Sequence, residues 1–321
     1  RKELELYLHI PFCVRKCAYC DFLSAAADEE TIRRYVDALI CEIERQRTFA
    51  RQYIVTTVFM GGGTPSILAG EETERIFRAL YQTFTFAEKP EITIEVNPGT
   101  VSEEKLRRWK ASGINRLSIG LQSADDRELK FLGRIHTFEA FTDTFHMARS
   151  CGFENINVDL ISAIPGQDLE SWERTLKRTA EAKPEHVSAY SLILEEGTPF
   201  YTWYVNEERP QGKKDLPALP GEDADREMYK KTESILKAYG YERYEISNYA
   251  KKGYACRHNL GYWERKEYLG LGLGAASLIG ERRFSNTSSL GEYLQIFETG
   301  QPTASARVGT EILSIEDQME E

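Results

Sequence analysis

Three cysteines near the N-terminus form the tightest group of metal-binding side chains in this sequence. Cys13, Cys17 and Cys20 follow a C-x3-C-x2-C spacing directly after a strand-like segment, residues 4–10. Three thiolates within eight residues must share one loop, and soft thiolate ligands select iron–sulfur clusters, zinc or copper(I). Because no fourth cysteine lies nearby in the sequence, the spacing predicts a metal centre with one coordination position open to a substrate or cofactor.

Structural zinc is the main alternative to an iron–sulfur cluster. A zinc site needs four ligands, and His9 or a residue distant in the sequence could complete it. The chain has six cysteines, an even number that would also allow disulfides. In a chain of this size, a tight group of three indicates metal binding instead. Cys41, Cys151 and Cys256 stand alone, and we expect them to be buried structural thiols.

Strand-like and helix-like segments alternate over the first two-thirds of the chain and must position this loop. Apolar runs predict strands, and apolar residues at helical spacing predict helices. The strands are predicted at residues 4–10, 55–60, 91–96, 116–120, 156–164 and 186–194, and the helices at residues 32–43, 76–84, 103–112, 138–149 and 172–182. About six βα units in roughly 200 residues are too few for a closed eight-unit barrel. We therefore predict an α/β fold, a partial (β/α)6 barrel with its ligand site at the carboxyl ends of the strands.

A polar stretch that contains proline and lysine interrupts the alternation at residues 206–221, where we predict a linker or mobile loop. It separates a barrel domain, residues 1–205, from a smaller C-terminal α+β domain, residues 222–321. In the second domain we predict a helix over residues 222–239 and short strands within residues 241–249 and 268–278. Because the sequence stops abruptly at Glu321, we expect this domain to be truncated.

The overall composition narrows the class of protein. Hydrophobic residues make up 41% of the chain and charged residues 29%, the balance of a globular protein. The net charge of −10 argues against nucleic acid as a partner, since phosphate binding needs a basic surface. No apolar run reaches the ~18 residues of a membrane span, and the charged N-terminus lacks the apolar core of a signal peptide. We expect a cytoplasmic protein, and peripheral contact with a membrane surface stays open.

Glycines and polar side chains follow the predicted strands at the end where the ligand site is expected. Gly61-Gly62-Gly63-Thr64 comes directly after one strand, and glycine lets backbone groups approach a ligand closely. Glu95 and Asp159 follow two further strands and can accept hydrogen bonds from hydroxyl or ammonium groups. Gln122 can donate and accept, and Arg134 can pair with a carboxylate. Taken singly, each also fits a turn, a cap, a surface amide or a solvated charge.

The segment Tyr7–Phe22 resembles the signature loop of the radical-SAM superfamily. Its run Tyr-x-His-Ile-Pro-Phe-Cys is similar to the coproporphyrinogen-dehydrogenase (HemN/HemW) family. Further blocks match this family in order, namely GGGTPS (61–66), EVNPG (95–99), SIGLQS (118–123), LGRIH (132–136) and NVDLI (157–161). The resemblance covers essentially the whole chain.

This resemblance implies a partial radical-SAM barrel with a [4Fe–4S] cluster on the three cysteines and S-adenosylmethionine (SAM) on the open iron. The SAM site that it implies is lined by Tyr7, Tyr19, Gly62, Gly63, Thr64, Glu95, Gln122, Arg134 and Asp159. The reduced cluster would break a carbon–sulfur bond of SAM, and the barrel interior would shield the reactive product from water. In such a site the protein supplies position and redox tuning, while the cofactor supplies the chemistry.

Two departures separate the branches of the family. The oxidase branch carries a further cysteine two positions after the third one, where this chain has Phe22. The segment Arg257–Trp263 reads RHNLGYW and matches the HNxxYW motif of the heme-chaperone branch. A neutral imidazole such as that of His258 can ligate heme iron, and Tyr262 and Trp263 could pack on a porphyrin face. A structural histidine beside two core aromatics is the plainer interpretation of the same residues.

The resemblance therefore favours a heme chaperone with a radical-SAM core. Such a protein binds heme and passes it to heme-accepting proteins, membrane-bound respiratory enzymes among them, and a homodimer is an open alternative to a monomer. The second hypothesis is a radical-SAM enzyme acting on a tetrapyrrole, either an oxygen-independent coproporphyrinogen III oxidase or a heme-degrading methyltransferase. The blocks of the SAM site fit both hypotheses, whereas Phe22 and the HNxxYW motif favour the first and argue against oxidase activity.

Overall fold

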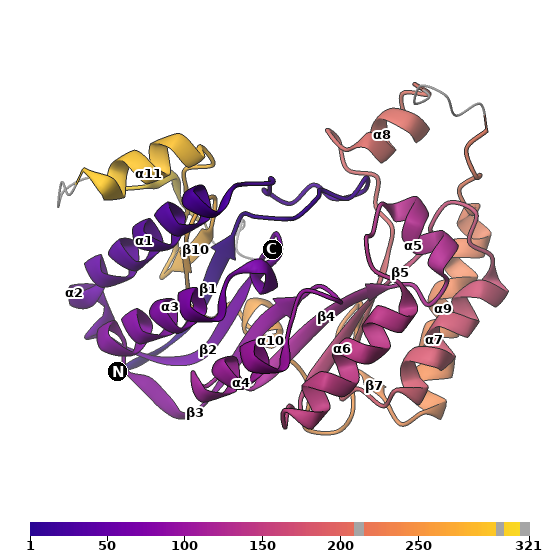
Figure 1. Cartoon of the computed structure of the whole chain (residues 1–321), viewed down its shortest axis with the longest axis horizontal. Helices are drawn as coiled ribbons and strands as arrows, with labels where there is room; N and C mark the ends of the chain where they lie inside the picture. Colours follow the sequence, from indigo (N-terminus) through magenta and orange to yellow (C-terminus); the bar gives the residue numbers. More distant parts are fainter. Residues whose placement is uncertain (209–214, 300–304, 315–321) are drawn as a thin grey trace.

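The computed structural model describes residues 1–208, 215–299 and 305–314 of the chain. In this part of the chain the strands form one sheet of twelve, in the order β12-β11-β10-β9-β1-β2-β3-β4-β5-β6-β8-β7. They are β1 (Lys2–Ile10), β2 (Tyr53–Gly62), β3 (Phe86–Val96), β4 (Arg116–Gln122), β5 (Ile156–Ser162), β6 (His186–Ser191), β7 (Glu242–Arg243), β8 (Asn248–Ala250), β9 (Tyr268–Leu271), β10 (Ala276–Ile279), β11 (Arg282–Asn286) and β12 (Arg307–Ile312). Figure 1 shows that the sheet is strongly twisted.

The six central strands, β1 to β6, run parallel to one another in chain order. Strand β1 has β9 as its other neighbour and β6 has β8, so the barrel is not closed. In the sequence ELELYLHI of β1, apolar and polar residues alternate, and successive side chains of a strand point to opposite faces of the sheet. Leu4, Leu6 and Leu8 belong to the hydrophobic core, while Glu5, Tyr7 and His9 take the opposite face. The predicted α/β fold with a partial barrel is confirmed.

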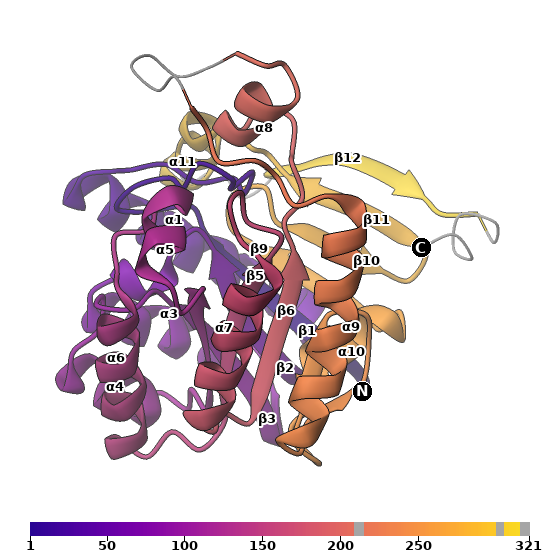
Figure 2. The ribbon, with the colours of Figure 1, turned by 90° about the vertical axis from the view of Figure 1, so that its right-hand side faces the viewer.

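Helices connect the parallel strands and lie next to one another along one face of the sheet (Figures 1 and 2). The helices are α1 (Glu29–Arg45), α2 (Arg47–Ala50), α3 (Gly70–Thr83), α4 (Glu103–Ala111), α5 (Asp126–Leu132), α6 (Phe138–Ser150), α7 (Leu169–Glu181), α8 (Pro199–Tyr204), α9 (Glu222–Ala238), α10 (Arg257–Trp263) and α11 (Leu290–Glu298), with a short 3-10 turn at Pro65–Ile67. Local signals set several of their starts, since the side chains of Asp28, Ser102 and Asp168 each accept a hydrogen bond from the first turn.

The C-terminal third of the chain joins both edges of the barrel sheet. Strand β9 pairs parallel with β1, whereas β8 pairs antiparallel with β6. The predicted helix over residues 222–239 is α9, and the two predicted strand regions hold β7 with β8 and β9 with β10. The division into domains at residues 205 and 222 stays a prediction, and residues 209–214 of the predicted linker lie outside the described residues.

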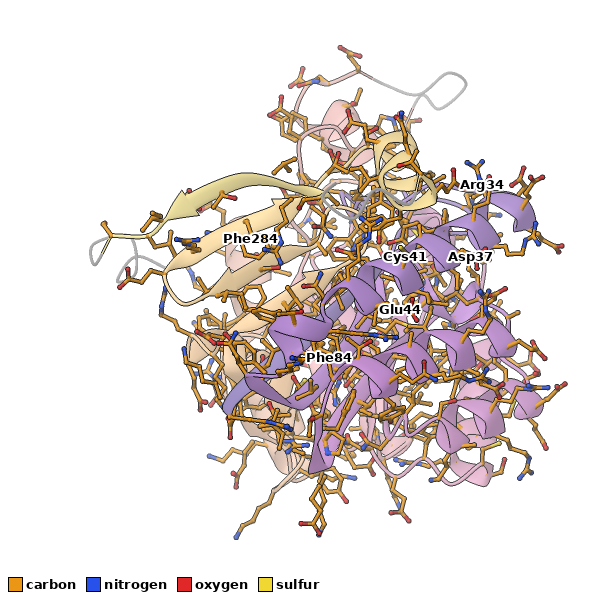
Figure 3. The ribbon with its side chains drawn as sticks, turned by 90° about the vertical axis from the view of Figure 1, so that its left-hand side faces the viewer. Arg34, Asp37, Cys41, Glu44, Phe84 and Phe284 are labelled. Carbon is orange, nitrogen blue, oxygen red and sulfur yellow. The ribbon has the colours of Figure 1, made fainter. Side chains whose placement is uncertain are left out.

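A buried carboxylate on α1 ties this C-terminal third to the barrel. Glu42 is 5% exposed and accepts hydrogen bonds from the N–H of Gly272 at 2.7 Å, from Asn286 Nδ2 at 2.7 Å and from the Tyr293 hydroxyl at 2.6 Å. In Figure 3, α1 crosses the view with Cys41 and Glu44 along it, and Phe284 of β11 lies beside it. The carboxylate therefore holds α1, the segment after β9, β11 and α11 together.

Two details differ from the sequence-based expectations. Strand β6 ends at Ser191 rather than residue 194, because the following residues turn across the end of the barrel. Cys151 and Cys256 are buried as expected, but Cys41 is only partly buried. Within the described residues, no helix is long and apolar enough to cross a membrane.

Candidate functional site

The three cysteines of the signature spacing lie on one wall of a cavity of about 380 Å³ at the carboxyl ends of the barrel strands. Pockets for small-molecule ligands fall in a range of roughly 300–1,000 Å³. Eight of the nine residues predicted for the SAM site line the same cavity, namely Tyr19, Gly62, Gly63, Thr64, Glu95, Gln122, Arg134 and Asp159. The structure thus brings together residues that are up to 146 positions apart, from Cys13 to Asp159.

The cysteine loop is held in place by its backbone and by two neighbouring side chains. The N–H of Cys13 donates to the carbonyl of Ala25 at 3.1 Å. The Thr64 hydroxyl donates to Cys13 Sγ at 3.3 Å, and Arg134 Nη1 donates to Cys17 Sγ at 3.8 Å. Burial raises the pKa of the Cys20 thiol to about 11. Metal binding must therefore displace a proton from Cys20, as it does from any thiol that becomes a ligand.

The glycine loop after β2 supports the cysteine loop directly. The N–H of Gly63 donates to the carbonyl of Ile10 at 2.8 Å, and the N–H of Thr64 donates to that of Phe12 at 2.7 Å. A Cβ on Gly63 would lie 2.6 Å from the Phe12 carbonyl oxygen. The N–H of Gly62 donates to Glu95 Oε2 at 3.1 Å. These N–H groups therefore hold protein partners rather than a ligand, and the absence of a Cβ at residue 63 allows two loops to touch.

Two partly buried carboxyl groups, Glu95 on β3 and Asp159 on β5, line the cavity. Burial, reinforced by the charge of Asp159, raises the pKa of Glu95 to about 8. Burial also raises the pKa of Asp159, although Asn157 and Ser118 donate to its two oxygens at 2.7 and 2.9 Å. A ligand that brings hydroxyl groups or a positive charge would satisfy these acceptors and lower both pKa values. This is the donor pattern of a ribose or an amino group.

Arg134 and Asn97 join the carboxyl ends of two strands to the cysteine loop. Arg134 Nη2 donates to Asn97 Oδ1 at 2.7 Å and to the Gly120 carbonyl at 2.9 Å, and Asn97 Nδ2 donates to the Thr64 hydroxyl at 2.9 Å. Arg134 Nε is buried and has no hydrogen-bond partner among the described residues. A buried donor beside a thiol sulfur suits an additional acceptor such as a sulfide or a carboxylate, so the residues present fit a sulfur-rich cluster with a ligand beside it.

His9 does not complete a zinc site with the three cysteines. Its Nε2 lies 2.8 Å from the Leu23 carbonyl and its Nδ1 lies 3.0 Å from the Tyr7 hydroxyl, so both ring nitrogens are occupied. Tyr7, the ninth residue predicted for the SAM site, lies behind His9 and outside the cavity lining. Among the described residues, no three or more Cys, His, Asp and Glu side chains are grouped to hold one metal ion. A cubane cluster binds each thiolate through a different iron.

Sequence reasoning missed one wall of the cavity. Tyr190 and Ser191 line it from the end of β6, and Leu192, Ile193 and Glu195 line it from the segment that follows. Ile193 at 67% and Phe22 at 58% are strongly exposed at its rim. The only signal for this wall in the sequence is its place after the last barrel strand, because no motif marks it. Asn97 was also missed as a site residue, although it stands in the matched EVNPG block.

The three residues predicted for heme lie at the other end of the barrel, on helix α10. His258 is 1% exposed, whereas Tyr262 is 40% and Trp263 is 55% exposed. His258 Nδ1 lies 2.7 Å from Thr57 Oγ1, and its Nε2 lies 3.1 Å from the Tyr262 hydroxyl. Thr57 precedes Gly62 by five residues on β2, which corresponds to about 16 Å of extended strand. The motif and the cavity are therefore separate sites.

Comparison with known proteins decides the family. The model of the radical SAM superfamily matches residues 7–179. The heme chaperone HemW of Lactococcus lactis is 36% identical over all of this chain and 80% of that protein, and HemW of Escherichia coli is 39% identical over 85% of this chain and 69% of that protein. This chain belongs to the HemW family of radical SAM proteins.

Solved structures agree with this membership of the HemW family. The coproporphyrinogen III oxidase HemN of Escherichia coli, a radical SAM enzyme, superposes with a TM-score of 0.83 at 27% identity. The match covers 99% of this chain and 74% of HemN. The radical SAM family implies a [4Fe–4S] cluster and SAM as cofactors, and the cavity with three thiols is the place in this fold whose donors fit them.

Proposed function

We propose that this protein is a heme chaperone with a radical-SAM core, which binds heme and transfers it to target proteins. Its main support is the identity of 36–39% to HemW proteins over 85–100% of the chain. The complete set of thiols and strand-end polar groups around one cavity supports the radical-SAM core. Transfer to membrane-bound respiratory enzymes and a cytoplasmic location, with peripheral contact at the membrane, belong to the same proposal.

Cys13, Cys17 and Cys20 would hold the cluster through their thiolates, and Thr64 and Arg134 would donate to the cluster sulfurs. Glu95 and Asp159 would accept from the hydroxyl and amino groups of SAM, Gln122 would contact its adenosine part, and Tyr19 would pack beside it. When bound, the cluster and SAM supply the reductive cleavage of a carbon–sulfur bond.

The residues of this chain would position the cluster and SAM. Arg134 and Asn97 fix the cysteine loop against β4 and the end of β3. The partly buried carboxyl groups of Glu95 and Asp159 place hydrogen-bond acceptors in the lining of the cavity. Because such acceptors are held by strands rather than by flexible loops, they need no reorganisation when SAM binds.

The alternative is a radical-SAM enzyme acting on a tetrapyrrole. Such an enzyme must bring its tetrapyrrole to the mouth of the cysteine cavity, where the radical chemistry occurs. Heme bound on Tyr262 and Trp263 would instead lie on helix α10, whose His258 contacts Thr57, about 16 Å of strand before Gly62. The chaperone proposal thus predicts heme away from SAM, and the enzyme alternative predicts a tetrapyrrole against it. Phe22, in place of the further cysteine of the oxidase branch, favours the chaperone.

A paired assay on the anaerobically reconstituted protein tests the proposal. We expect about four irons per chain, a cluster spectrum that changes when SAM is added, and a Soret shift on titration with heme. Cys17→Ala should lose the cluster and keep the Soret shift, because heme and cluster occupy different ends of the barrel. Conversion of coproporphyrinogen III by a protein without heme affinity would contradict the proposal and support the enzyme alternative.

A further inference from the structure

The histidine of the HNxxYW motif, His258, is buried and surrounded by other side chains. His258 is 1% exposed, and its ring stacks on Phe59 with centroids 5.3 Å apart and an interplanar angle of 26°. Both ring nitrogens lie within hydrogen-bond distance of hydroxyl oxygens, Nδ1 of Thr57 and Nε2 of Tyr262. A neutral imidazole offers one donor nitrogen and one acceptor nitrogen. With both in use, His258 has no lone pair directed at an open approach for iron.

Electrostatics keep this imidazole neutral. Burial, reinforced by the positive charge of Arg116, lowers the pKa of His258 to about 3. The carboxyl group of Glu5 lies 3.7 Å from Nδ1, and burial raises its pKa to about 8. At pH 7 the close contact between His258 and Glu5 therefore joins a neutral ring to a protonated carboxyl and is not an ion pair. Hydrogen bonding and packing hold the ring in its place.

Carboxyl groups from two strands seat helix α10 at the amino end of the barrel. Glu91 of β3 accepts from the N–H groups of Arg257 and His258, each at 3.1 Å, and from the Cys256 thiol at 3.4 Å. At the next turn of α10, a Cβ on Gly261 would collide with the carboxyl group of Glu5. Turning His258 toward solvent would break these contacts together. The glycine and the histidine of the HNLGYW segment are thus both explained by how the helix packs.

Tyr262 is the residue that this arrangement presents at the surface. Its ring stands at 82° to the His258 imidazole and at 86° to Tyr268, and its hydroxyl lies within hydrogen-bond distance of Nε2. Three contacts therefore fix the orientation of a ring that is 40% exposed. Trp263 follows it and is 55% exposed. A fixed aromatic pair at the surface suits a flat apolar ligand, because little rotamer freedom is lost when the ligand binds.

We infer that His258 is a positioning residue, which holds Tyr262 and helix α10 in place for heme and does not ligate the heme iron. This inference rests on the proposed heme-binding function. The iron would find its axial ligand elsewhere, while Tyr262 and Trp263 contact the porphyrin ring. The motif would then mark a helix that packs on the barrel strands and exposes two aromatic side chains, rather than a ligand of the heme iron.

The test compares His258→Gln with His258→Ala in the cluster-loaded full chain. The glutamine amide keeps a donor and an acceptor for Thr57 and Tyr262 but removes the imidazole. We expect His258→Gln to keep the Soret and electron paramagnetic resonance spectra of the ferric heme complex, with a heme Kd within about threefold of the unaltered protein. His258→Ala should lower the unfolding midpoint and weaken heme binding about tenfold, and added imidazole should not restore it.

Two further variants serve as controls. Tyr262→Phe keeps the ring but loses the hydrogen bond to His258, so a smaller loss than in His258→Ala is expected. His146 is an exposed histidine on α6, and His146→Ala should change nothing, which excludes adventitious ligation at the surface.

Loss of the same heme spectrum in His258→Gln and His258→Ala, at unchanged unfolding midpoints, would overturn the inference, as would recovery of that spectrum by imidazole. A direct 15N hyperfine coupling between the heme iron and His258 would overturn it as well. If the unaltered protein binds no heme, the proposed function fails. The positioning role is then judged by stability alone, where equal midpoints of the two His258 variants contradict it.

Discussion

At the scale of single residues, Arg134 contacts three separate parts of the cysteine site. Its guanidinium contacts Cys17, Asn97 and the Gly120 carbonyl, and its Nε is a buried donor without a partner in the described part of the chain. A planar fork of donors can serve several acceptors at fixed angles, which an ammonium group cannot do. Arg134 therefore links strand ends to the cluster loop.

Arg134→Ala should weaken retention of the cluster. The change leaves Asn97 Oδ1 and the Gly120 carbonyl without their donor and removes the charge beside Cys17. We expect fewer than half of the reconstituted irons to survive gel filtration, and SAM affinity to fall about tenfold. Arg127→Ala is the matched control, because the Arg127 side chain is 86% exposed and its ion pair is with the neighbouring Asp125. Equal iron retention in both variants would show that Arg134 is dispensable.

Glu5 should make the stability of the folded protein decrease with rising pH. Burial raises its pKa from 4.5 to about 8; Lys266 lowers it, while Glu91 and Glu264 raise it. Between pH 4.5 and about pH 8, Glu5 keeps its proton in the folded protein and loses it in the unfolded chain. The contribution of Glu5 to the free energy of unfolding is therefore full below pH 4.5 and is lost as the pH rises through about 8.

Glu5→Gln removes that contribution and keeps a neutral side chain of similar size. We expect the unfolding midpoint of the variant, measured by denaturant titration from pH 5 to pH 8.5, to fall less steeply with pH than that of the unaltered protein. Glu95, whose pKa is also raised to about 8, should leave a residual slope in both. Parallel pH curves for the two proteins would refute the assignment to Glu5.

At the scale of elements, the turn that ends β2 carries the strictest geometric demand. Gly62 has a φ of +110°, a conformation that residues with a side chain rarely adopt. A Cβ there would also lie 2.5 Å from the His9 ring. The turn must therefore shift if residue 62 gains a methyl group.

Gly62→Ala should reduce SAM binding by roughly tenfold or more, because it moves Gly62 N–H away from Glu95 and disturbs the wall behind the cavity. Equilibrium dialysis with SAM on the reconstituted protein measures the change. Gly291→Ala on α11 is the control, since nothing lies within 4 Å of its added Cβ and alanine favours a helix. A Gly62→Ala protein with unchanged SAM affinity would contradict the account of this turn.

The elements also show what could be predicted from the sequence. Strands and helices with strong periodicity, such as β1 and α1, were found within a few residues of their bounds. Helices α5, α8 and α10 were missed, because each is only six or seven residues long and lacks a full apolar stripe. Motif spacing located the cavity residues, but burial of His258 depends on Glu5, Thr57 and Glu91 from three other strands, which no local pattern reveals.

At the scale of the whole molecule, one carboxylate helps to join the C-terminal third to the barrel. Glu42→Ala leaves the buried groups of Gly272, Asn286 and Tyr293 without their shared acceptor. An unsatisfied buried group costs about 1–3 kcal/mol, so we expect the free energy of unfolding to drop by about 3 kcal/mol or more. Denaturant unfolding measures the loss.

Glu44→Ala on the same helix is the control for this change. Glu44 is 45% exposed and its ion pair with Arg47 is 3.5 Å long, so its removal should change the free energy of unfolding by less than about 0.5 kcal/mol. A similar loss in the Glu42 and Glu44 variants would show that the buried carboxylate does not join the two parts of the sheet.

At this scale the cysteine cavity and the proposed heme surface, Tyr262 with Trp263, are separate, because neither aromatic residue lines the cavity. The measurement that tests the central claim most directly is heme transfer from the heme-loaded, cluster-containing protein to a heme-free acceptor, followed by the absorbance of each after separation. The account predicts that heme moves to the acceptor with no change in the tetrapyrrole itself. Heme that stays bound, or a tetrapyrrole that is chemically altered when SAM is consumed, would contradict it.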